Sequence, residues 1–416
     1  MSIFVPFKAI RPLAAKAKEI ACRPYDVLDT QEAREKSKDN PNSFYRVIKP
    51  ELEFADEFDH YAPEIYQRGA DNFKKLVASG MMTQDRTENF YVYRIIMGKH
   101  SQTGLVGCCS IDDYFNDHIK KHELTRPDKE EDRKNHVRYS KVNYEPVFFS
   151  YPQVTDLDTI VAEASKQVPL YDITTSDGIQ HTLWSIENAS VVAQIVKLFE
   201  SKVPSIYVAD GHHRTAAGAL VAKELREASK GNSKDGKRYN YFMAVVFPDN
   251  QLKIQDYNRV VKDLNGHTYD SFLSELEKRF DVSPVEGQYR PEGLHHFGAY
   301  MNGQWYKLVA KAGSFNDRDP LGVLDVTILS SQVLEPLLNI VDLRTDKRIE
   351  FVGGIRGLEE LERKVDSGQM KAAFAMYPVS MKQLIDIADG GLIMPPKVTW
   401  FEPKLRSGLF VHSLEN

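Results

Sequence analysis

Hydrophobic periodicity divides the chain into alternating helix and strand segments. Apolar residues recur every three to four positions through residues 59–79 and again through 191–199, which predicts two amphipathic helices. Apolar or alternating runs bounded by turn signals predict strands at 90–97, 105–111, 171–173, 179–184, 205–209 and 241–247. This mixture of hairpins and strand–helix–strand passages is typical of an α/β or α+β protein.

The pattern changes after residue 265 and becomes more helical. Helices are predicted at 269–280, 325–338 and 380–388, with one apolar strand at 372–377. A chain of 416 residues exceeds one typical domain. We expect three segments: an N-terminal α/β segment with a hairpin (1–111), a core (112–265) and a C-terminal α/β segment that completes the site (266–416).

Composition and charge narrow the class of protein. Apolar residues make up 42% and charged residues 27%, as in an ordinary globular protein. The net charge of −5 argues against a nucleic-acid partner, and three cysteines are too few for a secreted disulfide framework. No run approaches the roughly 18 apolar residues of a membrane span, and Lys8 and Arg11 follow the apolar N-terminus where a secretory signal would have them precede it. We expect a cytoplasmic protein without a membrane partner; the oligomeric state stays open.

The strongest chemical signal is the sequence Asp210-Gly211-His212-His213-Arg214, between a predicted strand and a helix predicted from residue 215 to about 229. The small residues at 216–219 would let this helix pack close against a sheet or a ligand. Free backbone N–H groups and the helix dipole at such a junction favour an anion. Gly211 allows close backbone approach or a positive φ, Arg214 adds a forked cation, and the two histidines add donors near neutral pH. The turn, with Thr215 behind it, is predicted to bind phosphate or a nucleotide. The alternative is an ordinary helix start capped by Asp210.

A metal site at this turn is a second question. Adjacent helical residues do not face each other, so His212 and His213 are poorly placed to bind one ion together. We expect no intrinsic zinc, although one histidine combined with distant ligands stays open. Magnesium that arrives with ATP or ADP needs only one or two protein carboxylates, and Asp210 is the natural candidate.

The turn also carries a resemblance. The sequence from Tyr207 to Arg214 resembles the signature of a bacterial and archaeal family known as domain of unknown function 1015. The likeness extends over nearly the whole chain, through Arg23-Pro24-Tyr25-Asp26-Val27, His122-Glu123-Leu124-Thr125, Asp132-Arg133, Met394-Pro395-Pro396-Lys397 and Ser407-Gly408-Leu409. Cys22 and Val398 depart from the residues that are common in the family at those flanks.

The five-residue turn is similar, in addition, to the nucleotide-phosphate motif of the ParB/sulfiredoxin-like superfamily. That group includes free serine kinases, sulfiredoxins and nucleotide-binding domains of chromosome-partitioning proteins. The resemblance implies a nucleotide-binding core of mixed sheet and helices. It also implies a catalytic Glu upstream of the turn, and Glu123, next to His122, holds that position. A solvated charged loop is the alternative for this segment.

Further residues are candidate contacts to substrate or phosphate. Arg23 would clamp a carboxylate, with Tyr25 and Asp26 in the same rigid turn. Thr125, Arg133 and Lys397 are the remaining candidates. Each has a purely structural alternative, such as a local Asp132–Arg133 ion pair.

Three hypotheses for function follow. The first is a nucleotide-dependent phosphotransferase for a small hydroxyl metabolite, with free L-serine implied by the resemblance. In this hypothesis Glu123 is the base, with His122 and Asp210 beside it. The second is a hydrolase of a phosphomonoester such as phosphoserine. The third is a non-enzymatic nucleotide-binding switch related to chromosome-partitioning proteins, against which the acidic charge and the missing recognition-helix pattern count.

Overall fold

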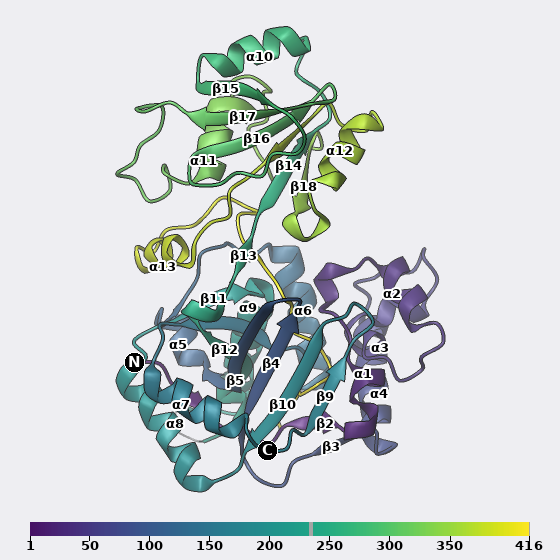
Figure 1. Ribbon diagram of the computed structural model, residues 1–416. Helices are drawn as coiled ribbons and strands as arrows, with labels where there is room; N and C mark the ends of the chain where they lie inside the picture. Colours follow the sequence, from purple (N-terminus) through teal and green to yellow (C-terminus); the bar gives the residue numbers. More distant parts are fainter. Residues whose placement is uncertain (233–235, 416) are drawn as a thin grey trace. The chain divides into compact units, whose positions relative to one another are not determined.

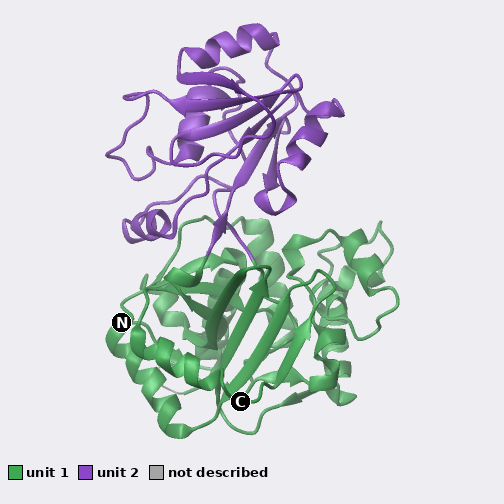
Figure 2. Cartoon of the chain, in the orientation of Figure 1, with its two compact units in different colours: residues 1–252, 403–416 green, residues 253–402 purple. Residues whose placement is uncertain are grey.

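The computed structural model describes residues 1–232 and 236–415 and divides the chain into two compact units (Figure 2). Unit 1 consists of residues 1–252 together with 403–416, and unit 2 consists of residues 253–402. Both ends of the chain therefore belong to unit 1, and unit 2 is an insertion near its C-terminus.

Unit 1 is organised around a mixed sheet (Figure 1). Its strands are β1 (Phe4–Val5), β4 (Phe90–Met97), β5 (His100–Ser110), β6 (Ile119–Lys120), β8 (Val147–Tyr151), β9 (Tyr171–Thr174), β10 (Gln180–Ile186), β11 (Ile206–Asp210) and β12 (Tyr241–Pro248). The order along the sheet is β6-β11-β8-β12-β5-β4-β10-β9, and β1 pairs with β5. β11 is parallel to β6 and β12 is parallel to β8, whereas the other pairs are antiparallel.

Helices supply the rest of unit 1. They are α1 (Ala17–Ile20), α2 (Thr30–Ser37), α3 (Tyr45–Ile48), α4 (Pro63–Ala78), α5 (Ile111–Phe115), α6 (Pro127–Ser140), α7 (Thr155–Ala164), α8 (Ala189–Lys202) and α9 (His212–Ala228). Two short strand pairs, β2 (Ile10–Pro12) with β3 (Met82–Gln84) and β7 (Val142–Asn143) with β21 (His412–Ser413), tie the ends of the chain to this unit. Among the described helices, none has the length and apolar character needed to cross a bilayer.

Three helices of unit 1 form its core together with the sheet. Helices α7, α8 and α9 pack against the sheet, where Leu157, Phe199 and Ala219 share one buried cluster with strand residues such as Phe149. The predicted close approach of α9 is confirmed at Gly218, where a Cβ would lie 3.3 Å from Phe242 Cβ on β12. A small residue in the second turn of α9 therefore lets the helix pack close to the sheet.

Unit 2 is a separate α/β layer. Its sheet runs β15 (Phe280–Val285), β17 (Gln304–Ala310), β16 (His296–Met301), β19 (Ala372–Ala375), β14 (Tyr257–Val261) and β18 (Ile349–Gly353), all antiparallel. A further pair joins β13 (Ile254–Gln255) to β20 (Trp400–Phe401). The α-helices of the unit are α10 (Tyr269–Glu277), α11 (Asp325–Leu329), α12 (Glu359–Asp366) and α13 (Met381–Asp389).

The mixed α/β class is confirmed, and most elements lie where they were predicted. The turn between the strands predicted at 90–97 and 105–111 is shorter than the gap of seven residues left between them, because Met97 already pairs with His100 and Gly98 takes a φ of 58°. The helix expected at 269–280 ends at Glu277, since Phe280 begins β15. The helix expected at 325–338 is α-helical only to Leu329 and continues as a π-helical turn.

The two units do not follow the three expected segments. β5, which ends the first segment, pairs with β12 of the second within one sheet, so the 111/112 boundary falls inside unit 1. The 265/266 boundary falls inside unit 2, after β14. Residues 403–416 return to unit 1, which no local pattern of hydrophobicity indicates.

Candidate functional site

The 210–214 turn joins β11 directly to α9. Gly211 is the N-cap residue of α9 with φ 91° and ψ 38°, a left-handed conformation that L side chains rarely adopt. The helix begins at His212, three residues before its predicted start, so His212, His213 and Arg214 form its first turn. Among the described residues no side chain caps this helix start, and Thr215 makes the first backbone bond, to Gly211 O at 2.9 Å. The preceding N–H groups are the donors that an anion would use.

Arg214 lies beneath the turn and does not extend to its surface. Its side chain is 6% exposed, Nη1 donates to Pro146 O at 2.9 Å, and Nη2 donates to Asp210 Oδ2 at 3.2 Å. A Cβ on Gly211 would lie 3.0 Å from the guanidinium. Burial opposes its charge, but nearby carboxylates, with Asp26 first, raise the pKa of Arg214 above its ordinary value. The cation therefore acts on the turn through its charge and its packing.

The carboxylate of Asp210, at the end of β11, forms ion pairs with two cations. Lys404 Nζ lies 3.3 Å from Oδ1, and Arg214 Nη2 lies 3.2 Å from Oδ2. Burial alone would raise the pKa of Asp210, but the charges of Lys404 and Arg214 hold it at about 2. Each carboxylate oxygen of Asp210 therefore faces a cation in the described structure, and its role as a magnesium ligand stays a prediction.

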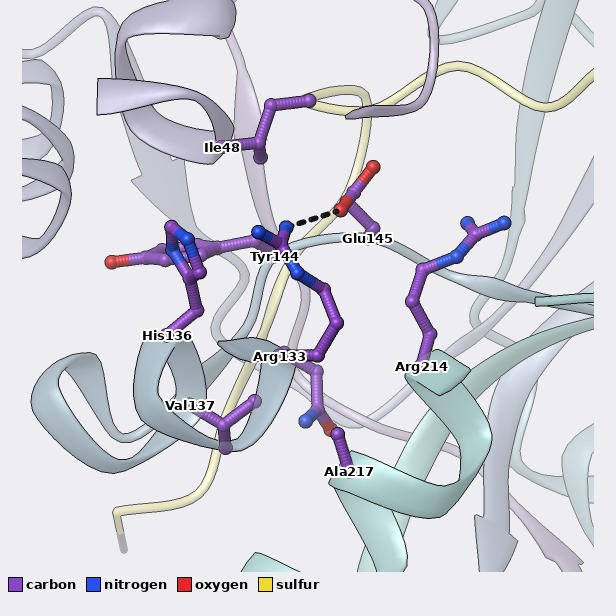
Figure 3. Close-up of a pocket in the computed structure, with 9 residues that line it drawn as sticks. Ile48, Arg133, His136, Val137, Tyr144, Glu145, Arg214 and Ala217 are labelled. Carbon is purple, nitrogen blue, oxygen red and sulfur yellow. Dashed lines mark ion pairs between the residues drawn. The ribbon is translucent and has the colours of Figure 1, made fainter. Parts of the chain in front are cut away.

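A buried ion network lies behind the turn, around Glu145 (Figure 3). In that view Glu145 lies between Arg133 and Arg214, with Arg133 Nη1 at 4.0 Å from Oε2. Ser407 Oγ and the Tyr25 N–H donate to Oε1 at 2.9 and 3.2 Å. Burial raises the pKa of Glu145, and the two arginines oppose this shift. The adjoining cavity of about 40 Å³ is too small for a nucleotide, so this network supports the turn from behind.

Arg133 and Tyr25 both belong to this buried network and contact each other in it. Arg133 donates twice to Asp132 Oδ2, at 2.6 and 3.0 Å, so the expected local ion pair is present. Its guanidinium carbon lies 3.8 Å from the centroid of the Tyr25 ring. With Arg133 8% exposed, its described contacts are to protein groups, which matches the structural alternative and not a phosphate contact.

The two histidines of the turn point to different neighbours. His213 Nε2 accepts a hydrogen bond from the backbone N–H of Arg126 at 3.0 Å. Because a backbone N–H only donates, Nε2 carries no proton, and the neutral ring holds its proton on Nδ1. His212 instead is buried and directs Nδ1 toward Glu123 Oε2, at 3.8 Å. The adjacent histidines therefore do not face one point, as their spacing predicted.

His122, Glu123 and His212 meet at the start of α9. The rings of His122 and His212 are perpendicular with centroids 4.5 Å apart. One nitrogen or oxygen from each of the three side chains lies within 4.8 Å of the others. Burial lowers the pKa of His122 to about 4 and the pKa of His212 well below its ordinary value. Both imidazoles are therefore neutral, while the Glu123 side chain is 40% exposed.

The remaining candidate residues are distributed around the site. Asp26 is exposed and is close enough to Arg214 and His213 to act on their pKa values. Thr125 Oγ1 donates to Glu130 Oε2 at 2.8 Å, and Thr215 Oγ1 donates to Gly211 O at 2.9 Å. These two hydroxyls therefore have protein acceptors in the described structure.

Arg23 and Lys397 are engaged elsewhere. Arg23 Nη2 lies 2.7 Å from Asp177 Oδ2, an ion pair that ties the N-terminal segment to the β9–β10 hairpin. Lys397 belongs to unit 2, where its ammonium lies 6.0 Å from the centroid of the Tyr257 ring. Within unit 1, the structure does not bring Arg23 together with the described contacts of the turn.

Two residues of the site were missed by sequence reasoning. Lys404 and Glu145 both contact groups of the turn or its supporting network. Each is remote in sequence from the turn, and neither forms a motif with it. Only the return of residues 403–416 to unit 1 brings Lys404 to Asp210.

Comparisons with known proteins identify the family and distant structural neighbours. A conserved hypothetical protein from Pyrococcus furiosus is 14% identical, with 76% of this chain and 98% of that chain covered and a TM-score of 0.34. A free serine kinase in complex with AMP is 13% identical, with 76% and 92% covered and a TM-score of 0.33. SbnI with C-terminal truncation from Staphylococcus aureus is 12% identical, with 74% and 87% covered and a TM-score of 0.38. Similarity this low does not carry an activity over to the present chain.

The comparison with curated proteins gives no match. The family model described as "Protein of unknown function (DUF1015)" matches residues 4–327. This match covers most of the chain, including the 210–214 turn and the His122–Glu123 segment. The protein therefore belongs to the DUF1015 family.

Proposed function

We propose that the protein is a nucleotide-dependent phosphotransferase that acts on a small hydroxyl compound. The observation that carries the proposal is the position of Glu123, 3.8 Å from His212 at the uncapped start of α9. A phosphate-binding helix start and a partly exposed carboxylate beside it are the two parts that phosphoryl transfer to a hydroxyl needs.

The nucleotide phosphates would bind the free N–H groups of the first turn of α9, with Gly211 allowing close approach. Arg214 and Lys404 lie on the Asp210 side of the turn and contribute positive charge, in part offset by Asp210 itself. His213 accepts the Arg126 backbone N–H at Nε2 and holds its proton on Nδ1 as a donor. We expect ATP or ADP as the phosphoryl donor.

In the proposed step the substrate hydroxyl oxygen attacks the terminal phosphorus and its proton passes to the Glu123 carboxylate. The bond from phosphorus to the bridging oxygen breaks, and the nucleotide leaves with one phosphate fewer and the bonding electron pair on that oxygen. Glu123 suits this role because its side chain is 40% exposed at the edge of a buried histidine pair. The first substrate to test is free L-serine, which the motif resemblance implies.

The experiment is phosphorus NMR of the protein with magnesium, ATP or ADP, and a panel of small hydroxy acids and hydroxyl-bearing amino acids. A new phosphomonoester resonance that requires both the nucleotide and one member of the panel is the expected result. Release of inorganic phosphate from phosphoserine without nucleotide would instead identify a hydrolase. Nucleotide binding by calorimetry without turnover of any compound would contradict the enzymatic proposal and favour a binding switch.

A further inference from the structure

We propose that His122, Glu123 and His212 form a binding site for a divalent transition-metal ion such as Zn²⁺ or Co²⁺. The three side chains come from the loop after β6 and from the first residue of α9, and they offer two imidazole nitrogens and one carboxylate oxygen. A set of two histidines and one carboxylate is a common protein ligand set for catalytic zinc and for other transition ions with open positions.

The donor set decides the class of ion. Magnesium and calcium prefer oxygen ligands throughout, whereas imidazole suits zinc, cobalt, nickel, copper and iron. The two rings already lie against each other, with centroids 4.5 Å apart. Because two of the three donor atoms are imidazole nitrogens, the site favours a transition-metal ion over Mg²⁺.

The geometry is close to that of a bound site, with one adjustment. Ligand atoms around a tetrahedral zinc ion lie about 3.3 Å from one another, given metal–ligand distances near 2.0–2.1 Å. In the structure the three donor atoms lie within 4.8 Å of one another, and His212 Nδ1 lies 3.8 Å from Glu123 Oε2. A side-chain movement of about 0.5 Å by Glu123, which is 40% exposed, would bring the His212–Glu123 distance from 3.8 Å to the tetrahedral spacing.

The surroundings of the two rings also fit a metal site. His122 is 2% exposed and hydrogen-bonds to the backbone carbonyl of Val208, the type of outer bond that orients metal-binding histidines. In a neutral ring that donates from one nitrogen, the other nitrogen carries a lone pair suited to a metal. His212 Nε2 is buried and makes no hydrogen bond to any residue that the structure describes. This ring is therefore not an ordinary, fully hydrogen-bonded core histidine.

The site differs from the metal site that sequence reasoning considered. The pair considered from the sequence was His212 and His213, and the structure turns His213 toward Arg126 instead. The second histidine is His122, which lies far away in sequence. Binding in the absence of nucleotide does not depend on the proposed phosphotransferase activity, so the two proposals can fail separately.

The test is a titration of the metal-free full-length protein with Co²⁺, followed by visible absorption, and then displacement by Zn²⁺. We expect one Co²⁺ per chain with the absorption of a site with nitrogen ligands, full displacement by an equivalent of Zn²⁺, and no displacement by millimolar Mg²⁺. His212→Ala should weaken Co²⁺ binding on the order of 100-fold or more, because even lost outer-shell partners cost about 10–100-fold. His213→Ala is the matched control and should bind Co²⁺ like the parent protein.

Glu123→Gln is the second test variant, because it changes a partly exposed side chain and should preserve the fold. It should also weaken Co²⁺ binding, while its circular dichroism and thermal unfolding stay unchanged. Three results would overturn the proposal: no stoichiometric Co²⁺ binding by the parent protein, equal losses in His212→Ala and His213→Ala, or displacement of Co²⁺ by Mg²⁺ as easily as by Zn²⁺.

Discussion

The guanidinium of Arg214 lies directly against the Cα of Gly211, so that a Cβ on Gly211 would approach it to 3.0 Å. The same guanidinium donates to Pro146 O and to Asp210, which fixes its position. Gly211 thus meets two requirements at once: a positive φ and space for a buried cation. This relationship makes the turn sensitive to changes that leave its hydrogen-bonding groups intact.

Gly211→Ala should destabilise the protein more than the same change at another positive-φ glycine. Gly178, in the β9–β10 hairpin turn, has φ 77°, and a Cβ added there would meet no atom within 4 Å, so Gly178→Ala should cost about 1–2 kcal/mol from backbone strain alone. Gly211→Ala adds the contact with Arg214 and should cost about 1–2 kcal/mol more. Chemical denaturation of both variants gives the comparison. Equal losses would show that Arg214 moves away at no cost.

Arg214→Ala should be among the most destabilising single changes in unit 1. Removing a buried cation leaves Pro146 O without its donor and reduces the positive charge beside Asp210 and Glu145. Loss of one partner from a buried ion network typically costs about 3–5 kcal/mol. The free energy of unfolding from a denaturant titration is the measurement.

The control for this change is Arg138→Ala. Arg138 on α6 pairs with Glu224 on α9, and the two side chains are 29% and 45% exposed, so its loss should cost less than about 1 kcal/mol. If Arg214→Ala proves no more destabilising than Arg138→Ala, the supporting role given to Arg214 is wrong. Nucleotide binding would then be the remaining reason for its position.

Local patterns predicted the elements well but the site only in part. The apolar run of β4 coincides with its predicted bounds, 90–97, because strand patterning is a property of consecutive residues. The start of α9 was placed three residues late, since His212, His213 and Arg214 do not continue the apolar stripe. The pairing of Lys404 with Asp210 follows from the tertiary course of the chain and leaves no trace in either local segment.

Acid should destabilise unit 1 through His181. Its Nε2 accepts from Arg406 Nε at 3.1 Å, which requires a neutral ring, and burial followed by the charge of Arg406 lowers the pKa of His181 to about 3. In the unfolded chain the same histidine takes up a proton near pH 6.5. The contribution of the neutral His181 ring to stability is therefore complete above that pH and is lost as the pH falls toward 3. Between pH 7 and pH 5 the loss from this residue is about 2 kcal/mol.

The measurement is the free energy of unfolding at pH 7 and pH 5 for the parent protein and for His181→Gln. Glutamine can keep a hydrogen bond to Arg406 but does not titrate, so the variant should lose about 2 kcal/mol less than the parent over this interval. His60→Gln, at an exposed position, should lose as much as the parent. An unchanged pH dependence in His181→Gln would contradict this interpretation.

Unit 2 should respond to pH in the opposite direction through Asp325. Burial raises the pKa of Asp325 to about 7, although the backbone N–H of His295 donates to its Oδ1 at 2.8 Å. A raised pKa gives stability that is complete below about pH 4 and is lost as the pH rises through 7. The free energy of unfolding of the parent protein should therefore fall by about 2–3 kcal/mol between pH 5 and pH 8 because of this residue. In Asp325→Asn this contribution to the fall should be absent.

Tryptophan fluorescence follows this change, because Trp305 and Trp400 belong to unit 2. Denaturation of Asp325→Asn at pH 5 and pH 8 should give nearly equal midpoints, whereas the parent protein should unfold earlier at pH 8. Asp317→Asn, at an exposed position, should behave like the parent. The prediction is wrong if Asp325→Asn keeps the pH dependence of the parent protein.

In the proposed reaction, Glu123 removes the proton from a hydroxyl during transfer of a phosphoryl group bound at the start of α9. This role is measured most directly as the rate of phosphomonoester formation by Glu123→Gln, with Glu130→Gln as the control from the same segment. We predict a loss of about 10²–10⁴-fold in turnover for Glu123→Gln, with nearly unchanged nucleotide affinity. The metal affinity of the same variant is measured in parallel, so that loss of a bound ion can be told apart from loss of the base. Glu130→Gln should turn over at the parental rate. A Glu123→Gln protein that transfers phosphate at near the parental rate would show that Glu123 is not the base.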